Sequence, residues 1–328
     1  MFGFFLDSAD VPLTIALMAI VVSMLGIAQL AGYILRRQPD TTINPGIVAA
    51  FNNRLRSYWM MCAILTAAFL FPGPRATVIL FFFISFWALR EFITLAPTRM
   101  GDHRTLFHVF IVLTPLQYVL VTFVDKRFEL FSIATPVYGF LFIPTRIALS
   151  GDPKRFLERA AKIQSALLIC VFALSHAPAL LYLNYKRFDG TPWPGAKAGV
   201  LFFLILLVQV GDVLQYAWGK FLGKHVIAPE INANRTWEGF IGGTLSTSLL
   251  ATILWWATPF EMWQAAGMGF VIALMGFAGT MTMSAIKRDR GVRDFGTLVR
   301  GHAGVLDRID SLCFAAPVFF HLTRLFFT

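Results

Sequence analysis

The residues best suited to chemistry lie between Ser284 and Asp310, in a charged stretch between two apolar segments. This stretch holds six Lys or Arg residues, four Asp, one His and four Gly, although only 14% of the 328 residues are charged. Glycines let backbone N–H groups approach a ligand closely, and clustered carboxylates bind hard divalent cations. A solvated linker could carry as much charge, but it would not need His302 and three glycines between Asp294 and Asp307. We therefore expect a phosphate-and-metal site at a membrane surface.

Three carboxylates in this stretch form the best candidate for a magnesium site. Asp307 and Asp310 are three residues apart and would share one face of a helix that begins near Leu306. The glycine-containing loop could bring Asp294 next to them. Because Mg²⁺ binds one or two carboxylates together with phosphate oxygens, this set predicts magnesium-dependent phosphate chemistry.

The basic residues and the histidine around these carboxylates each allow two interpretations. Lys287 and Arg288 follow a long apolar helix, so they are either phosphate ligands or stop-transfer charges. Arg308 could bind phosphate or pair with a neighbouring carboxylate. His302 could act as a general base, but a phosphomonoester is already an anionic nucleophile near neutral pH. We therefore favour backbone shaping or phosphate contact for His302.

A second polar region begins at Asp212, near the end of an otherwise apolar helix. An ionisable side chain is costly there, so it should face a cavity, a partner or an ion, unless it simply reaches the interface near Lys220. Lys220, Lys224 and Arg235 could neutralise a triphosphate, with arginine suited to bidentate contact and lysine acting as a point charge. This region therefore predicts a nucleotide-binding surface.

The next predicted helix opens with polar residues and contains a glycine pair. Thr236 could cap this helix at Trp237, and Glu238 would favour its first turn, although both could equally contact a ligand. Gly242 and Gly243 lie inside the helix, where we expect close packing against another helix.

Both polar regions resemble the same family. The patterns S-x-x-K-R, R-D-F-G and G-H-x-G-x-x-D-R-x-D, between Ser284 and Asp310, are similar to the signature of the CDP-diacylglycerol synthases (phosphatidate cytidylyltransferases), which are integral membrane enzymes. The segment from Asp212 to Gly243 resembles a further motif of that family, with an aspartate, G-K-x-x-G-K-H and R-T-x-E-G.

The chain also departs from the family pattern, which indicates a divergent paralogue. Thr280 stands where the family commonly has a metal-binding aspartate, four residues before the serine of the signature. Arg293 stands where the family usually has lysine, and the loop before Arg235 matches only in part. We therefore expect a metal site that is altered at position 280.

The resemblance implies CTP-dependent cytidylyl transfer to phosphatidate, which yields CDP-diacylglycerol and pyrophosphate. It implies CTP and a phospholipid as substrates, Mg²⁺ as cofactor with a second metal ion left open, and a homodimer. It assigns catalysis to Lys287, Arg288, Asp294 and Asp307, metal binding to Asp212, Asp294, Asp307 and Asp310, and substrate or nucleotide binding to Lys220, Lys224, His225, Arg235, Thr236, Glu238, Ser284, Arg293, Gly301, His302, Gly304 and Arg308.

Three other functions stay open. One is a CTP-dependent enzyme that acts on another lipid phosphate or on an isoprenoid alcohol. The others are a membrane carrier and a non-catalytic scaffold. A carrier site is expected near the middle of the membrane, whereas the charged residues here cluster at one interface, so we favour the enzyme.

Composition places the chain in a membrane. Hydrophobic residues make up 57% of it and aromatic residues 15%, which leaves too few charges to cover a soluble surface. The three cysteines lie singly in apolar runs, as packing residues do.

We expect one all-α polytopic membrane domain over residues 1–328 with about 8–10 transmembrane helices. Residues 1–198 would form a helical N-terminal part, and residues 199–328 would carry the motifs. The ten apolar runs are Val11–Leu35, Arg56–Phe71, Ala76–Leu89, Leu106–Val124, Leu130–Ile143, Ile163–Leu183, Gly199–Ala217, Phe240–Ala257, Ala265–Ile286 and Ser311–Phe327.

The charge distribution predicts the orientation of these runs. If they alternate across the membrane, 21 of the 28 Lys and Arg residues fall on the side of the two polar regions. The positive-inside rule places that side, and the catalytic loops, in the cytoplasm of a bacterial inner membrane. The net charge of +10 then reflects orientation and attraction to anionic lipid, so we expect no nucleic-acid partner.

Overall fold

The computed structural model describes residues 74–328 apart from 96, 97, 293 and 297–303, together with scattered residues between 19 and 66. The chain divides into two compact units, Met1–Thr77 and Val78–Thr328. The predicted runs Val11–Leu35 and Arg56–Phe71 lie largely outside the described residues. The fold below is that of the second unit, and the single-domain prediction stays a prediction.

The described part of the chain is built from helices and contains no β-strand, only two isolated bridges. Among the described residues, seven helical stretches are long and apolar enough to cross a membrane, so the predicted all-α polytopic membrane fold is confirmed. Together with α12, they correspond to eight of the ten predicted runs. The seven are α3 (Pro74–Thr94), Met100–Val121, Phe128–Ala148, Phe156–Tyr182, α10 (Lys197–Leu222), α13 (Met262–Asp289) and α14 (Leu306–Phe327).

Three of the seven stretches contain a π-helical segment between α-helical parts. The first consists of η1 (Met100–Asp102), α4 (His103–His108), η2 (Val109–Leu113) and α5 (Thr114–Val121). The second consists of α6 (Phe128–Ile133), η3 (Ala134–Gly139) and α7 (Phe140–Ala148). The third consists of α8 (Phe156–Leu167), η4 (Leu168–Ala173), α9 (Leu174–Ala179) and η5 (Leu180–Tyr182). The remaining elements are α11 (Pro229–Asn232), α12 (Trp237–Ile253) and η6 (Trp255–Ala257).

The helix α3 is longer than the apolar run Ala76–Leu89 from which it was predicted. It has 21 residues because it continues through Arg90 and Glu91 to Thr94. A helix of about 20 residues spans the roughly 30 Å apolar core of a bilayer. The length of α3 therefore suits a crossing.

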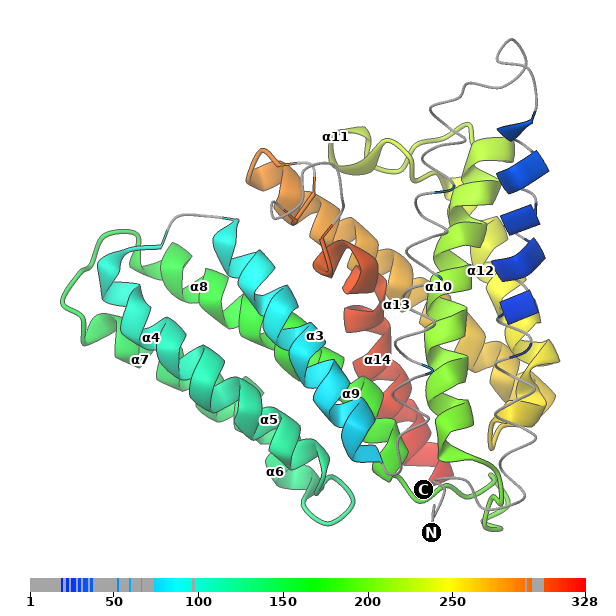
Figure 1. Cartoon of the computed structure of the whole chain (residues 1–328), viewed down its shortest axis with the longest axis horizontal. Helices are drawn as coiled ribbons and strands as arrows, with labels where there is room; N and C mark the ends of the chain where they lie inside the picture. The colour runs from blue at the N-terminus through cyan, green and yellow to red at the C-terminus, as the bar shows by residue number, and fades with distance from the viewer. Residues whose placement is uncertain are drawn as a thin grey trace. The chain divides into compact units, whose positions relative to one another are not determined.

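Hydrogen bonds between distant segments bring several helix ends together. Leu306 at the start of α14 donates its backbone N–H to Glu91 near the end of α3, and Arg290 after α13 contacts Glu158 at the start of α8. The carbonyl oxygen of Ile231 in α11 accepts a hydrogen bond from Arg288, so α11 lies beside the end of α13 (Figure 1). We call this the site end of the helices. The loops predicted to share one side of the membrane meet there.

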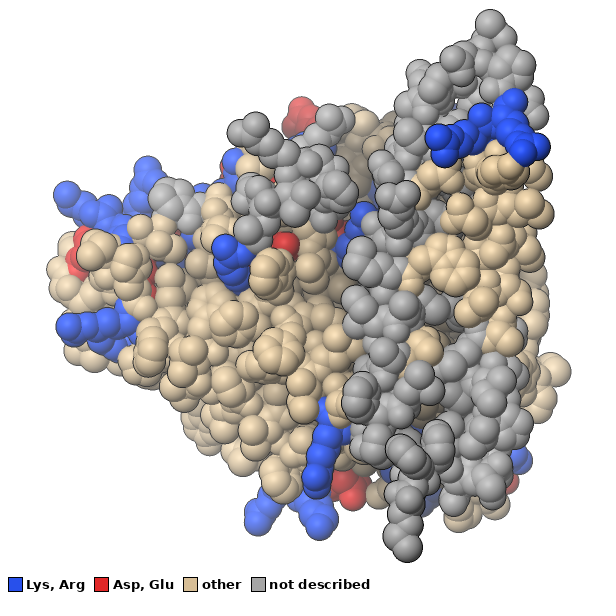
Figure 2. Space-filling model, viewed as in Figure 1, with Lys and Arg blue, Asp and Glu red and all other residues tan. Residues whose placement is uncertain are grey.

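A buried ion pair fixes the starts of α4 and α8 at the same end. The Arg159 guanidinium donates to both carboxylate oxygens of Asp102, with Nη2 at 2.7 Å from Oδ1. The side chains are 7% and 2% exposed, respectively. Figure 2 shows charged side chains gathered toward the ends of the helices, with largely uncharged surface between them. Ile79, Phe83 and Ile111 are exposed apolar residues of the described helices, as expected where lipid covers a protein.

Glycines let α10 and α12 approach closely. A Cβ atom on Gly239 would lie 2.6 Å from the carbonyl oxygen of Gln215, and one on Gly243 would lie 2.7 Å from the backbone nitrogen of Gln215. A Cβ on Gly242 would meet the ring of Trp218. The predicted packing role of Gly242 and Gly243 is therefore confirmed, and it brings the first turns of α12 against the polar part of α10.

We expect Gly243→Ala to lower the unfolding temperature in detergent, because the new methyl group meets the backbone of Gln215 as well as its side chain, and the backbone cannot easily move. Overpacking of this kind typically costs about 1–3 kcal/mol. The matched control is Gly267→Ala in α13, where a Cβ has nothing within 4 Å. That variant should leave the unfolding temperature unchanged or raise it slightly, since alanine favours helix. Equal unfolding temperatures for the two variants would contradict the packing argument.

Candidate functional site

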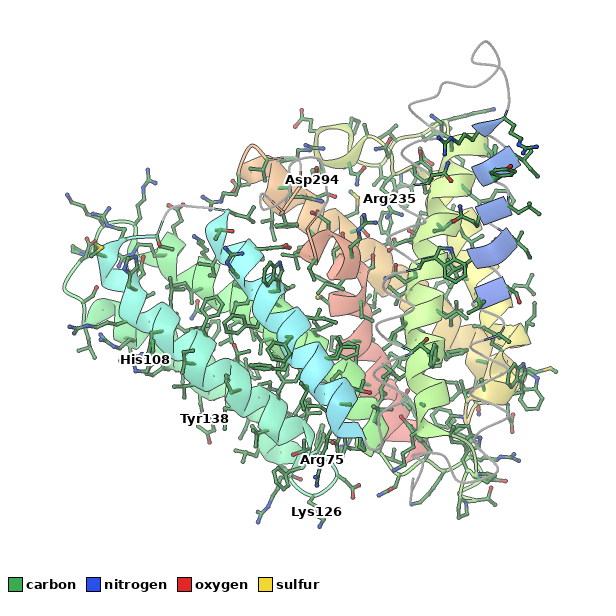
Figure 3. All side chains as sticks on the ribbon, viewed as in Figure 1. Arg75, His108, Lys126, Tyr138, Arg235 and Asp294 are labelled. Atoms are coloured by element: carbon green, nitrogen blue, oxygen red, sulfur yellow. The ribbon has the colours of Figure 1, made fainter. Side chains whose placement is uncertain are left out.

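The predicted site residues that the structure describes lie at the site end of α10, α12, α13 and α14. In Figure 3, Arg235 and Asp294 are labelled at this end, whereas Lys126 is labelled at the opposite one. Arginine and carboxylate side chains from segments far apart in sequence thus share one end of the helices. The described residues that the sequence suggested for chemistry therefore lie near one another at the site end.

At the centre of the site, Arg235 bridges two helices. Its Nη2 donates to Asp212 Oδ1 in α10 at 2.9 Å and to Thr280 Oγ1 in α13 at 3.3 Å, and its Nη1 donates to Gln215 Oε1 at 2.8 Å. The guanidinium is 12% exposed and the Asp212 side chain 25%. Of the expected environments for Asp212, which were a cavity, a partner or an ion, the structure shows a partner, Arg235.

Ser311 joins this cluster to the second predicted carboxylate. Its hydroxyl donates to Asp212 Oδ2 and lies 2.9 Å from Thr280 Oγ1, while its backbone N–H donates to Asp310 Oδ1 at 2.8 Å. Asp212 and Asp310 thus converge on one serine at the start of α14. Within the described residues Asp310 is buried and forms no ion pair, so its charge is the least compensated in the cluster.

Asp307 is occupied differently from Asp310. Its Oδ1 accepts from Lys287 Nζ at 2.8 Å, and its Oδ2 accepts the backbone N–H groups of Phe295 at 2.8 Å and Gly304 at 3.0 Å. The carboxylate therefore ties α13 to both ends of the loop before α14. It holds the loop where the sequence analysis expected it to hold a metal ion.

The four predicted metal ligands are only partly brought together. Asp212 and Asp310 share Ser311, Asp307 precedes Asp310 by three residues but is paired with Lys287, and Asp294 is exposed. In the part of the chain that the structure describes, no group of three or more His, Cys, Asp or Glu is placed to hold a metal ion. Asp212 and Asp310 remain together. Two carboxylates are enough for Mg²⁺ when phosphate groups supply further oxygens.

A glutamate that the sequence analysis did not single out orients the start of α14. Glu91, buried in α3, accepts the backbone N–H groups of Val305 at 3.0 Å and Leu306 at 2.8 Å. Its negative charge also lies at the positive end of the helix dipole. A Cβ on Gly304 would approach Glu91 Oε2 to 2.5 Å, so the glycine leaves room for this contact. The only sequence signal was a lone glutamate at the end of an apolar run.

The loop between α10 and α12 is closed by short-range bonds. Val226 pairs with Thr236 in an isolated antiparallel bridge, and Thr236 Oγ1 accepts from Gly239 N at 3.1 Å, so the predicted cap is confirmed. Glu238 accepts from the His225 imidazole and from two loop N–H groups. The His225 hydrogen bond holds the pKa of Glu238 well below its usual range, at about 2. Glu238 therefore anchors the loop as an anion.

The other predicted residues lie around this centre. Lys220 and Lys224 are exposed, and neither side chain forms an ion pair within the described residues. Arg288 contacts the backbone of Ile231, and Ser284 accepts from Asn232. Arg308 accepts a bond from Gln209 at its carbonyl oxygen. The predicted residues outside the described part are Arg293, Gly301 and His302.

The profile of the cytidylyltransferase family matches residues 52–326, most of the chain and all of this site. The chain belongs to the cytidylyltransferase family. It is therefore a nucleotidyltransferase that transfers a cytidylyl group, and its long apolar helices make it an integral membrane member of the family. The resemblance seen in the two motifs is thus confirmed at the level of the family.

Individual relatives extend this finding. The chain is 39% identical over 273 residues to a protein of Escherichia coli (strain K12) named "Uncharacterized protein YnbB", covering 83% of this chain and 86% of that one. It is 37% identical over 180 residues to the phosphatidate cytidylyltransferase of Mycobacterium leprae (strain TN), covering 53% of each. It is 36% identical over 120 residues to that of Staphylococcus aureus (strain COL), covering 36% of this chain and 46% of that one. The chain thus spans about half the length of these last two relatives.

We expect Glu91→Gln to destabilise this cytidylyltransferase, because the amide can accept only one of the two N–H bonds and removes the charge at the start of α14. A buried donor left without a partner costs about 1–3 kcal/mol. Thermal unfolding of the purified protein in detergent measures the loss. The matched control is Glu158→Gln, whose side chain is 45% exposed in its ion pair. If the control destabilises the protein as much as Glu91→Gln, the helix-capping role is wrong.

Proposed function

We propose that the chain transfers the cytidylyl group of CTP to phosphatidate, forming CDP-diacylglycerol and pyrophosphate. The observation that carries this proposal is the convergence of Asp212 and Asp310 on Ser311, beside Arg235 and Lys287, at the end of membrane-spanning helices. A water-soluble nucleotide and a lipid headgroup can meet only at such an interface. Two relatives with matching segments are named phosphatidate cytidylyltransferase, which favours phosphatidate as the acceptor.

The nucleotide phosphates would bind along the basic residues that face solvent. Lys220 and Lys224 are exposed beside the loop that carries Arg235, so their ammonium groups can reach a triphosphate. Lysine acts there as a mobile point charge, whereas arginine can contact two phosphate oxygens at once. Neutralising these oxygens makes the α-phosphorus easier for an anionic nucleophile to approach.

The donor set fits Mg²⁺. Asp212 and Asp310 present two carboxylates that share Ser311, and the phosphates of the nucleotide would complete an octahedral set of oxygens. Bound there, Mg²⁺ supplies charge neutralisation at the transferring phosphate. Asp307 has a structural role instead, because its bonds to Lys287 and to two backbone N–H groups join α13 to the loop before α14.

In the proposed reaction, a phosphate oxygen of phosphatidate attacks the α-phosphorus of CTP and forms the new P–O bond. The bond from the α-phosphorus to the oxygen that bridges to the β-phosphate breaks, and pyrophosphate leaves with that oxygen. The attacking phosphate is already anionic, so no general base is required. The role of this chain's basic residues is to bind both phosphates in line and to neutralise their charges.

The site end would face the cytoplasm of a bacterial inner membrane, where CTP is available. Basic residues concentrate in the loops at 90–104, 146–162, 220–235 and 287–308, which supports this orientation. A homodimer is part of the same proposal only through the family resemblance. The orientation is tested by introducing single cysteines into exposed loops and labelling them from each side of the membrane. The homodimer is tested by measuring the mass of the protein in detergent.

We expect Asp310→Asn to abolish product formation in detergent with CTP, Mg²⁺ and phosphatidate, measured as CDP-lipid and pyrophosphate. The loss should exceed the roughly 10–100-fold that removal of an outer-sphere partner of a metal typically causes. The matched control is Asp189→Asn, a carboxylate in an exposed turn where it accepts only from Thr191. The control should retain the activity of the unaltered protein.

The other outcomes of this assay each identify a different error. If the unaltered protein binds CTP but forms no CDP-lipid, phosphatidate is the wrong acceptor, and other lipid phosphates and isoprenoid alcohols are tested next. Absence of CTP binding would reject the enzyme and favour the carrier or scaffold. Full activity of Asp310→Asn would reject the assigned carboxylate pair while leaving the reaction in place.

A further inference from the structure

The guanidinium of Arg235 cannot bind the nucleotide phosphates and keep all of its contacts within the protein at the same time. Under the proposed function it contacts the phosphates of CTP, yet in this structure its guanidinium faces inward to Asp212, Gln215 and Thr280. The side chain is 12% exposed, so it is committed to these inward contacts. Binding a phosphate bidentately would require at least part of this set to be given up.

Both carboxylate oxygens of Asp212, in turn, already accept hydrogen bonds. Its Oδ1 accepts from Arg235 at 2.9 Å and lies 3.4 Å from Thr280 Oγ1, and its Oδ2 accepts from Ser311. A divalent cation on this carboxylate would be placed against the guanidinium, and like charges a few ångströms apart repel strongly in a partly buried site. Arg235 and a metal ion therefore compete for Asp212.

The backbone of the loop is fixed, which leaves the Arg235 side chain as the part that can move. The Arg235 carbonyl accepts from Ile227 N at 3.0 Å, and its N–H donates to the Asn232 carbonyl. The next residue, Thr236, caps α12. A rotation of the long side chain can thus transfer the guanidinium from Asp212 toward the side of Lys220 and Lys224 without unfolding the loop.

We propose that Arg235 is an exchangeable counter-ion that couples metal binding to nucleotide binding. Without nucleotide it neutralises Asp212 and keeps a divalent cation from binding there. The nucleotide phosphates withdraw the guanidinium and expose the carboxylate, so the metal ion binds Asp212 and Asp310 together with the nucleotide. This inference rests on the proposed function in one respect, that the site binds CTP.

The first arm of the test measures Mn²⁺ binding without nucleotide, by the electron paramagnetic resonance signal of the free ion in detergent. Mn²⁺ stands in for Mg²⁺. Arg235→Gln should bind Mn²⁺ about tenfold more tightly than the unaltered protein, within the usual range of coupling between two ligands. Asp212→Asn should bind Mn²⁺ more weakly than the unaltered protein, because one of the two proposed metal-binding carboxylates is lost.

A matched control separates this effect from a change in net charge. Arg290→Gln removes a positive charge at the same end, from an ion pair with Glu158 that lies outside the cluster. It should not tighten Mn²⁺ binding as Arg235→Gln does. Equal tightening in the two variants would overturn the proposal in favour of a general electrostatic effect.

The second arm measures binding of CTP with a metal chelator present, by equilibrium dialysis. Asp212→Asn should bind metal-free CTP more tightly than the unaltered protein, because the negative charge that attracts Arg235 inward is removed. Arg235→Gln should bind it more weakly, and the double variant should show no gain over Arg235→Gln. A purely structural ion pair predicts weaker binding, or none, in both single variants, and that result would overturn the proposal.

The two arms also separate this inference from the proposed function. If the unaltered protein binds no CTP, the proposed function fails, and the competition for Asp212 is still decided by the Mn²⁺ arm. If Arg235→Gln does not elute as a folded species in size-exclusion chromatography, Arg235→Lys keeps the charge but offers a single donor group. It should then bind Mn²⁺ with an affinity at or above that of the unaltered protein, and a weaker affinity would overturn the competition.

Discussion

Each acidic side chain at the site end of the helices needs donors, and the way this need is met determines the shape of the site. Glu91 is satisfied by the N–H groups that open α14, Asp307 by Lys287 and the loop backbone, and Asp212 by Arg235. Each of these contacts joins segments that are far apart in sequence. Because an unsatisfied carboxylate is so costly beside apolar helices, these bonds fix where α3, α10, α13 and α14 end relative to one another.

Small residues make this network possible. A Cβ on Gly279 would lie 2.7 Å from the carbonyl oxygen of Asp310, so α13 and α14 can pack closely enough for the Thr280 and Ser311 hydroxyls to bond. Gly243 does the same between α12 and α10, which keeps the loop that carries Arg235 over Asp212. In lipid, helices gain little from apolar contact alone, so such close approaches and the hydrogen bonds they allow contribute much of the packing energy.

Periodicity and composition predicted the helices well, because a membrane requires long apolar helices whatever their partners are. The helix expected to begin near Leu306 is α14, which begins at that residue. The partner of each charged residue could not be predicted. Nothing in the sequence says that Arg235 reaches Asp212 rather than solvent, or that Glu91 reaches a backbone 215 residues away, because such contacts depend on how whole helices pack. The sequence thus identified the segments that meet at the site end, whereas the pairings within them needed the structure.

Thr280 shows how that division arises. An aspartate there would place a further negative charge beside Asp212, whereas the threonine hydroxyl accepts from Arg235 and bonds Ser311 without adding charge. One guanidinium then suffices to neutralise Asp212. Under the proposed function, a threonine at position 280 also leaves Asp212 and Asp310 as the only two carboxylates proposed for Mg²⁺. Nucleotide phosphates and water would supply the other oxygen ligands, so metal binding at the proposed site would depend more strongly on the nucleotide.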